Sequence, residues 1–182
     1  MNYYISDTHF GHNNVIKFDH RPFSDADEMD CAMIHLWNDK VTNKDNVYIL
    51  GDFCFRSSKD PVWYLRQLKG KKHLIQGNHD QITLKNQEAM SHFLTVDKML
   101  FVQDNKHKLV LCHFPIAEWN GFYKGAWHIY GHIHSRMDGS GEYMRRQKRA
   151  LNAGCMINGY APVTLEELIE NNHVWKHQTS TP

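Results

Sequence analysis

Five short apolar runs, each ending in side chains that bind metals, constrain this chain more than any other feature. The central run leads into Gly77-Asn78-His79-Asp80. Ligands of open α/β sheets collect just outside the carboxyl ends of the strands. We therefore expect these polar side chains to meet at one edge of an α/β fold. The other clusters are Asp7-Thr8-His9, Gly51-Asp52, His113 and Gly131-His132-Ile133-His134.

The first half of the chain alternates predicted strands with predicted helices. Such an alternation predicts parallel strands joined by right-handed crossovers. Three helices are expected in this half. The first covers residues 24 to 41 and is capped by Ser24, the second begins at Asp60-Pro61, and the third covers residues 81 to 91. The strands are expected at residues 3 to 6, 47 to 50 and 73 to 76.

The second half has a different pattern, in which strands follow one another. Residues 94 to 101 and 108 to 112 flank a polar turn, which predicts a hairpin. Further strands are expected at residues 127 to 130, 143 to 151 and 155 to 157. A capping box of Thr164 and Glu167 begins the last helix, and a short strand or tail is expected from His173. The chain as a whole predicts an α/β (α+β) fold, with two mixed sheets packed together and helices outside.

The overall composition excludes several other classes of protein. A length of 182 residues predicts one domain, 1–182. The formal charge of +1 gives no general attraction to nucleic acid or membrane. No apolar run approaches the roughly 20 residues of a membrane span, and Asp7 leaves no room for a signal peptide before the first cluster. The four cysteines form no CxxC pair, which favours a cytoplasmic protein without a disulfide framework.

The chemistry of the clustered side chains favours hydrolysis at a metal centre. Asp and Asn offer oxygen, His offers nitrogen, and no cysteine takes part, which suits Mn, Fe, Zn or Mg-like ions. Eight candidate donors are too many for one ion. Two ions about 3.5–4 Å apart that share a carboxylate fit better, and such a pair supports in-line displacement at phosphorus.

The ordered motifs DTH, GD, GNHD, H and GHIH, over residues 7 to 134, resemble those of the calcineurin-like metallophosphoesterase superfamily. Residues 152 to 154 and 162 to 167 resemble the end of small bacterial and phage members. The resemblance implies an αββα sandwich and two divalent ions, with Mn²⁺ first and Fe, Zn, Ni or Mg as alternatives. It also implies attack by a hydroxide between the metals, without a covalent phosphoenzyme.

The same resemblance implies a role for each motif residue. Asp52 would bridge the two ions, His79 would contact the phosphate and assist the leaving oxygen, and Asp80 would orient His79. The first ion would be held by Asp7, His9 and His134, and the second by Asn78, His113 and His132.

Other residues near the motifs have either a structural role or a role in substrate binding. Protein phosphatases of this superfamily carry GDxxDRG, whereas here Phe55 and Ser57 replace the second Asp and the last Gly. This difference disfavours a protein phosphatase but leaves Arg56 as a candidate phosphate contact. His12 and Asn14 are either loop residues or substrate contacts. Arg21 either fixes the loop after Phe18 or faces the site.

The substrate expected first is a small phosphodiester or a nucleotide. A phosphomonoesterase acting on small metabolites or proteins is the alternative, and a non-catalytic scaffold of the same fold is a third reading. No membrane partner is expected, and the oligomeric state is not predicted. A basic run is interpreted as a solvated hairpin face, with a phosphate-rich partner such as nucleic acid as its second reading. The run comprises Arg145, Arg146, Lys148 and Arg149, with Arg136 nearby.

Overall fold

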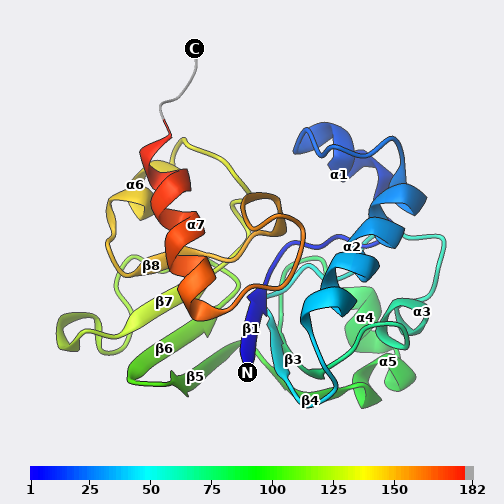
Figure 1. Ribbon diagram of the computed structural model, residues 1–182, viewed down its shortest axis with the longest axis horizontal. Coiled ribbons are helices and arrows are strands. Elements are labelled where there is room, and N and C mark those ends of the chain that lie inside the picture. The colour runs from blue at the N-terminus through cyan, green and yellow to red at the C-terminus, as the bar shows by residue number, and fades with distance from the viewer. Residues whose placement is uncertain (179–182) are drawn as a thin grey trace.

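The computed structural model describes residues 1–178, which form two four-stranded sheets flanked by helices (Figure 1). All pairings in the first sheet are parallel, and in the second only the β5–β6 pairing is antiparallel. The predicted fold class is confirmed, although the first sheet is not mixed. The first sheet has the order β1 (Asn2–Ile5), β2 (Asn46–Ile49), β3 (Lys71–Ile75), β4 (Phe93–Asp97), and the second β5 (Met99–Asp104), β6 (His107–Cys112), β7 (Trp127–Tyr130), β8 (Ala150–Asn152).

Four helices of the first half lie on the outer side of the first sheet, and the first helix of the chain lies above the strands (Figure 1). The long helix predicted from residue 24 is confirmed, but its cap is Asp25, whose side chain accepts a bond from the Glu28 amide. Asp60 caps the next helix as predicted. The helix predicted at residues 81 to 91 is broken in two, because Asn86 ends one piece and caps the next. The helices are α1 (Asn13–Phe18), α2 (Ala26–Lys40), α3 (Pro61–Leu65), α4 (Gln81–Lys85) and α5 (Gln87–Ser91).

The helices of the second half correct three sequence predictions. The strand predicted at residues 143 to 151 is wrong: the chain forms a helix that buries Gly141 and Met144, and only β8 remains extended. The basic run therefore lies on a helix end and a turn, not on a hairpin. The short strand predicted at residues 155 to 157 is a 3₁₀ turn. The helices are η1 (Phe122–Lys124), α6 (Ser140–Arg146), η2 (Cys155–Ile157) and α7 (Leu165–His177).

Helix α7 begins at the predicted capping box of Thr164 and Glu167. It continues through His177, where a strand or tail was expected from His173, and residues 179–182 lie outside the described part of the chain. Leu168, Asn172 and Trp175 are buried at helical spacing, which explains the extra turns. Within residues 1–178, no helix is both long and apolar enough to cross a membrane.

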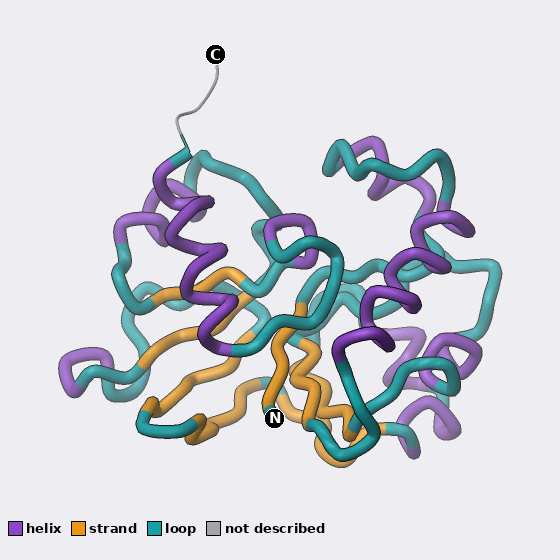
Figure 2. Tube along the Cα trace, viewed as in Figure 1, coloured by secondary structure: helices purple, strands orange, loops and turns teal. Residues whose placement is uncertain are grey.

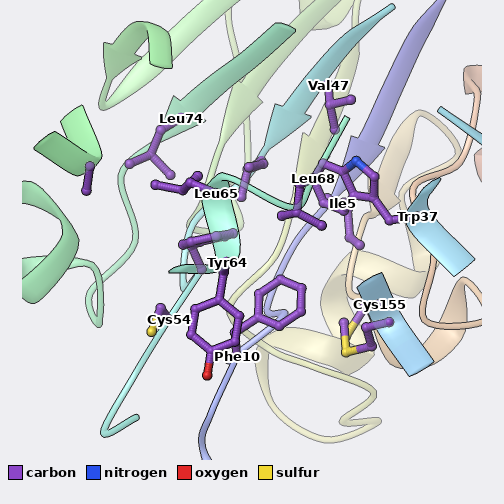
Figure 3. Close-up of a cluster of buried hydrophobic side chains, with 14 of the residues drawn as sticks. Ile5, Phe10, Trp37, Val47, Cys54, Tyr64, Leu65, Leu68, Leu74 and Cys155 are labelled. Atoms are coloured by element: carbon purple, nitrogen blue, oxygen red, sulfur yellow. The ribbon is translucent and has the colours of Figure 1, made fainter. Parts of the chain in front are cut away.

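The core has layers on both faces of the first sheet. Ile5 packs with Trp37 of α2 and with Tyr64 and Leu65 of α3 beneath the outer helices (Figure 3). Tyr4, the preceding residue of β1, points the other way, into a cluster between the two sheets. Because neighbouring strand residues face opposite sides, β1 is buried on both faces. The strands thus form the centre of the molecule (Figure 2), and their loops supply the site.

Candidate metal centre

The loops at the carboxyl ends of the strands bring the five motifs together. The chain leaves β1 and β2 side by side: the Asp7 amide donates to the Gly51 carbonyl, and the His9 amide to the Asp52 carbonyl. Gly131 follows β7 and closes the site from the second sheet. A Cβ atom on Gly131 would lie 1.8 Å from Ser6 Oγ, so only glycine fits there.

Several predicted ligands have a left-handed backbone, which is uncommon outside glycine. The φ angles are 55° at Asp7, 49° at His9, 55° at Asp52, 70° at His132 and 53° at His134. Such conformations carry strain and cluster at functional sites. Here they turn the side chains after each strand into one shared space.

The first candidate ligand group is Asp7, His9 and His134, whose donor atoms lie within 4.8 Å of one another. Both ring nitrogens of His9 are buried and have no hydrogen-bond partner among residues 1–178. Burial lowers the pKa of His9 well below its ordinary value, so the ring is a neutral donor. Buried nitrogens without partners are costly, and a bound cation would satisfy one of them. The group therefore fits a metal ion.

The second candidate group is Asp7, Asp52 and His113, again within 4.8 Å. Asp52 Oδ2 lies 3.6 Å from His9 Nε2 of the first group and 3.5 Å from His113 Nε2 of its own group, so it lies between these two rings. Burial, and next to it the charge of Asp7, raise the pKa of Asp52 to about 6, although His113 opposes the shift. Two buried carboxylates this close favour a cation between them.

Asn78 and His132 complete the second group. Asn78 Oδ1 lies 3.1 Å from His113 Nε2 and 2.9 Å from His132 Nδ1. The three residues that the resemblance implies for a second ion are thus together. The backbone amide of His132 also points at both carboxylate oxygens of Asp7, at 3.1 Å each, which joins the two halves of the centre.

Asp19 is a residue of the site that the sequence reasoning missed. Both its carboxylate oxygens lie 2.7 Å from His134 Nδ1, which leaves Nε2 facing Asp7 at 3.8 Å. Burial alone would lower the pKa of His134, but the bond to Asp19 and the charge of Asp7 outweigh it and raise that pKa. A carboxylate behind a ligating histidine fixes the orientation of the ring. No motif marks Asp19, and 115 residues separate it from His134.

Arg21 supports the Asp19 carboxylate and fixes its own loop. This is one of the two roles that the sequence left open for Arg21. Its buried guanidinium donates to Asp19 Oδ2 and to the carbonyl oxygens of Asp7 and Thr8. Arg21 thus ties the Asp19 carboxylate to the loop that carries Asp7 and His9.

Asp80 has a structural role that the sequence did not indicate. Its carboxylate is fully buried and accepts three backbone bonds, from Gly77 at 2.7 Å, Asp52 at 2.9 Å and Phe53 at 2.8 Å. Both oxygens accept amide protons, and among residues 1–178 no hydrogen bond joins Asp80 to the His79 ring, so its role in orienting that ring stays a prediction. Asp80 also fastens the loop after β3 to the loop after β2 and so holds Asp52 in place.

His79 borders the candidate metal centre and packs against neighbouring aromatic rings, which form one wall of the site. Its ring is 5.5 Å from that of His9 and 4.1 Å from that of Phe55, between centroids, and its backbone amide donates to Asp52 Oδ1. His12 is buried on the same wall, 5.0 Å from the Phe55 ring. Arg56 is exposed, with its guanidinium 5.1 Å from the Phe55 ring centre.

The last of these candidates is Asn14. It is exposed on α1, and within the described residues its side chain forms no hydrogen bond. The wall beside the centre therefore consists of His79, Phe55, His12 and Arg56. Phe55, where the protein phosphatases have Asp, packs against His79 and offers it no charge.

Comparisons with known proteins find chains of similar sequence and a solved structure of similar fold. No protein-family model matches it. It is 28% identical over 172 residues to the gene 66 protein of Mycobacterium phage L5, covering 80% of this chain and 83% of that protein. The crystal structure of the protein of unknown function AQ665 from Aquifex aeolicus matches with a TM-score of 0.73 and 25% identity, over 93% of this chain and 98% of that one.

The similarity is greater to the uncharacterized protein MJ1445 of Methanocaldococcus jannaschii. The two sequences are 32% identical over 170 residues, which cover 92% of this chain and 89% of the relative. Identity at this level over nearly the full length of both chains indicates common descent and a common fold. The chain therefore belongs to the same protein family as MJ1445.

Proposed function

We propose that this protein is a phosphoesterase that uses two divalent metal ions to hydrolyse a phosphodiester or nucleotide-type phosphoester. The observation that carries the proposal is the position of Asp52 Oδ2, between His9 Nε2 and His113 Nε2. A carboxylate oxygen with donor groups on both sides is suited to sharing two ions. The partnerless nitrogens of His9 support the same assignment.

Two sets of donors would hold the ions, with Asp52 shared between them. The mixture of carboxylate, amide and imidazole donors suits Mn²⁺, Fe, Zn, Ni or Mg, and Mn²⁺ is proposed first because of the resemblance of the motifs. The ions would supply a nucleophile at neutral pH by acidifying water and would neutralise charge on the phosphoryl oxygens. The first set is Asp7, His9 and His134, and the second Asn78, His113 and His132.

The wall beside the donors would bind and protonate the substrate. His79 borders the first set and is held by its own backbone bond to Asp52, so its ring is positioned to give a proton to the leaving oxygen. Arg56 is the exposed cation of the wall and would contact phosphoryl oxygens. His12 lies behind Phe55 and would support that wall.

A phosphodiester or nucleotide is proposed ahead of a phosphomonoester. The rings of Phe55, His79 and His12 give the wall an apolar character that suits a diester with its second organic group. A monoesterase remains the alternative proposal, and a phosphoprotein substrate is disfavoured because Phe55 and Ser57 break the protein-phosphatase motif.

The test compares hydrolysis of bis-p-nitrophenyl phosphate and p-nitrophenyl phosphate before and after exhaustive chelation. Chelation should abolish hydrolysis, Mn²⁺ should restore it, and the diester should be favoured. Calorimetric titration should find two ions per chain in the native protein and weakened binding at both sites in Asp52→Asn. Asp39→Asn, an exposed carboxylate on α2, serves as the matched control.

Each contrary outcome has its own meaning. Full hydrolysis by metal-free protein would refute the use of metals. Two bound ions without hydrolysis of either ester would indicate the non-catalytic scaffold. Normal binding of two ions by Asp52→Asn would refute the shared carboxylate.

A further inference from the structure

A second cavity lies away from the metal centre, between α6, α7 and the start of β7. Its volume is about 390 Å³, and it shares no lining residue with the ligand groups. Trp127, which lines the cavity, is the first residue of β7, whereas the proposed ligand His132 follows the other end of that strand. Helices α6 and α7 lie beside each other in Figure 1, and their contacts build the walls.

The walls of this cavity are positively charged. Arg145, Arg146, Lys148 and Lys176 line it, and no Asp or Glu does. Arg146 pairs with Glu142, which lies in solvent, and such exposed pairs contribute little. Within residues 1–178, the other three cations form no salt bridge. An anion entering the cavity would therefore meet three cations without carboxylate partners and one, Arg146, whose partner is exposed.

Two of the cations are held in place by backbone carbonyls. Lys176 Nζ donates to the carbonyls of Gln147, at 2.8 Å, and Ala150, at 2.5 Å, which leaves one of its three donors free. Burial lowers the pKa of Lys176 to about 8, because it disfavours the charged ammonium group. An anion bound beside this group would stabilise its charged form. Arg145 donates to the carbonyls of Lys176 and Gln178 and ties α6 to the end of α7. These cations are ordered before any ligand arrives.

The floor of the cavity is apolar. Leu151 is buried, and Trp127 and Ile169 are half-buried and pack on the cluster between the sheets. The rings of His173 and His177, whose centroids are 4.4 Å apart, lie on the rim. Such a floor favours a flat ring, because aromatic groups stack well on Trp and His side chains.

We propose that this cavity binds a small organic anion that joins a flat ring to a phosphate group, as a nucleoside monophosphate does. The ring would cover Trp127 and Ile169, and the phosphate would meet Lys148, Arg146 and Lys176. A volume of about 390 Å³ falls within the range of small-ligand sites. This proposal does not rest on the proposed hydrolysis, since the two sites share no residue.

The test is isothermal titration of the full-length protein with adenosine monophosphate, adenosine and inorganic phosphate. The monophosphate should bind at least tenfold more tightly than either part alone. Arg146→Gln combined with Lys148→Gln should weaken it at least tenfold, since both side chains are exposed and their loss leaves the fold intact. Trp127→Leu should weaken it as well. The control, Lys44→Gln with Lys106→Gln, should bind as the wild type does.

A further variant separates this cavity from the metal centre. Asp52→Asn should keep the affinity for adenosine monophosphate, and the Arg146/Lys148 variant should keep its hydrolysis of the small diester. Unchanged affinity in the Arg146/Lys148 variant, or loss of binding in Asp52→Asn, would overturn the proposal. Tight binding of a single-stranded oligonucleotide without binding of the monophosphate would overturn it too, in favour of nucleic acid.

Discussion

Acid should destabilise this protein through His128, a fully buried residue of β7. Its Nδ1 lies 2.9 Å from the Val110 carbonyl and its Nε2 accepts the Ile116 amide at 3.1 Å, so the structure requires a neutral ring with the proton on Nδ1. Burial lowers the pKa of His128 to about 4, although the bond to the Val110 carbonyl opposes the shift. A second proton would also break the bond from Ile116.

The sign and the size follow from proton linkage. The folded-state pKa of about 4 lies below the unfolded value of 6.5, so protons bind the unfolded chain more tightly. This contribution to stability is complete above pH 6.5 and is lost as the pH falls from 6.5 through 4. At roughly 1.36 kcal/mol per pKa unit, about 3 kcal/mol is lost by pH 4. That is a large share of the roughly 5–15 kcal/mol that stabilises a domain.

Urea unfolding at pH 7.5 and pH 4 measures this loss. His128→Gln keeps a donor and an acceptor but does not titrate, so its stability should fall by about 3 kcal/mol less than that of the wild type over this range. Release of bound metal in acid affects both proteins and cancels in the comparison. His35→Gln, an exposed histidine on α2, should behave as the wild type does. An equal loss in His128→Gln and the wild type would refute the reasoning.

The remaining predictions concern the metal centre. His79→Ala should keep its metals and lose about 10²–10⁴-fold in kcat, with a smaller loss for p-nitrophenyl esters than for alkyl esters; one ion per chain by metal analysis would make His79 a ligand instead. Asp19→Asn should weaken calorimetric binding of one ion by about 10–100-fold, because His134 loses its orienting carboxylate, and unchanged binding would deny Asp19 this role. Gly131→Ala should cost about 1–3 kcal/mol in urea unfolding, and Ser6→Ala should recover part of it; no loss in the single variant would contradict the tight fit.

The sequence alone was sufficient for features that depend on neighbouring residues. The alternation of strands and helices, the cap at Asp60 and the capping box at Thr164 are confirmed, because each is a pattern within a few positions. The meeting of Asp7, Asp52 and His113 also followed, since parallel strands end at one edge of a sheet. The sequence itself gives the chemical type of these side chains, and therefore the kind of ligand they offer.

Tertiary structure decided the features that depend on distant parts of the chain. The segment after Gly139 is helical because Met144 finds a buried place against the second sheet, which its own sequence does not disclose. Asp80 turned out to bind three backbone amides, and Asp19 to hold His134 across 115 residues. The sequence identifies a carboxylate but not the hydrogen-bond donor that it binds in the folded chain. Only the path of the folded loops determines that donor, and with it the role of the residue.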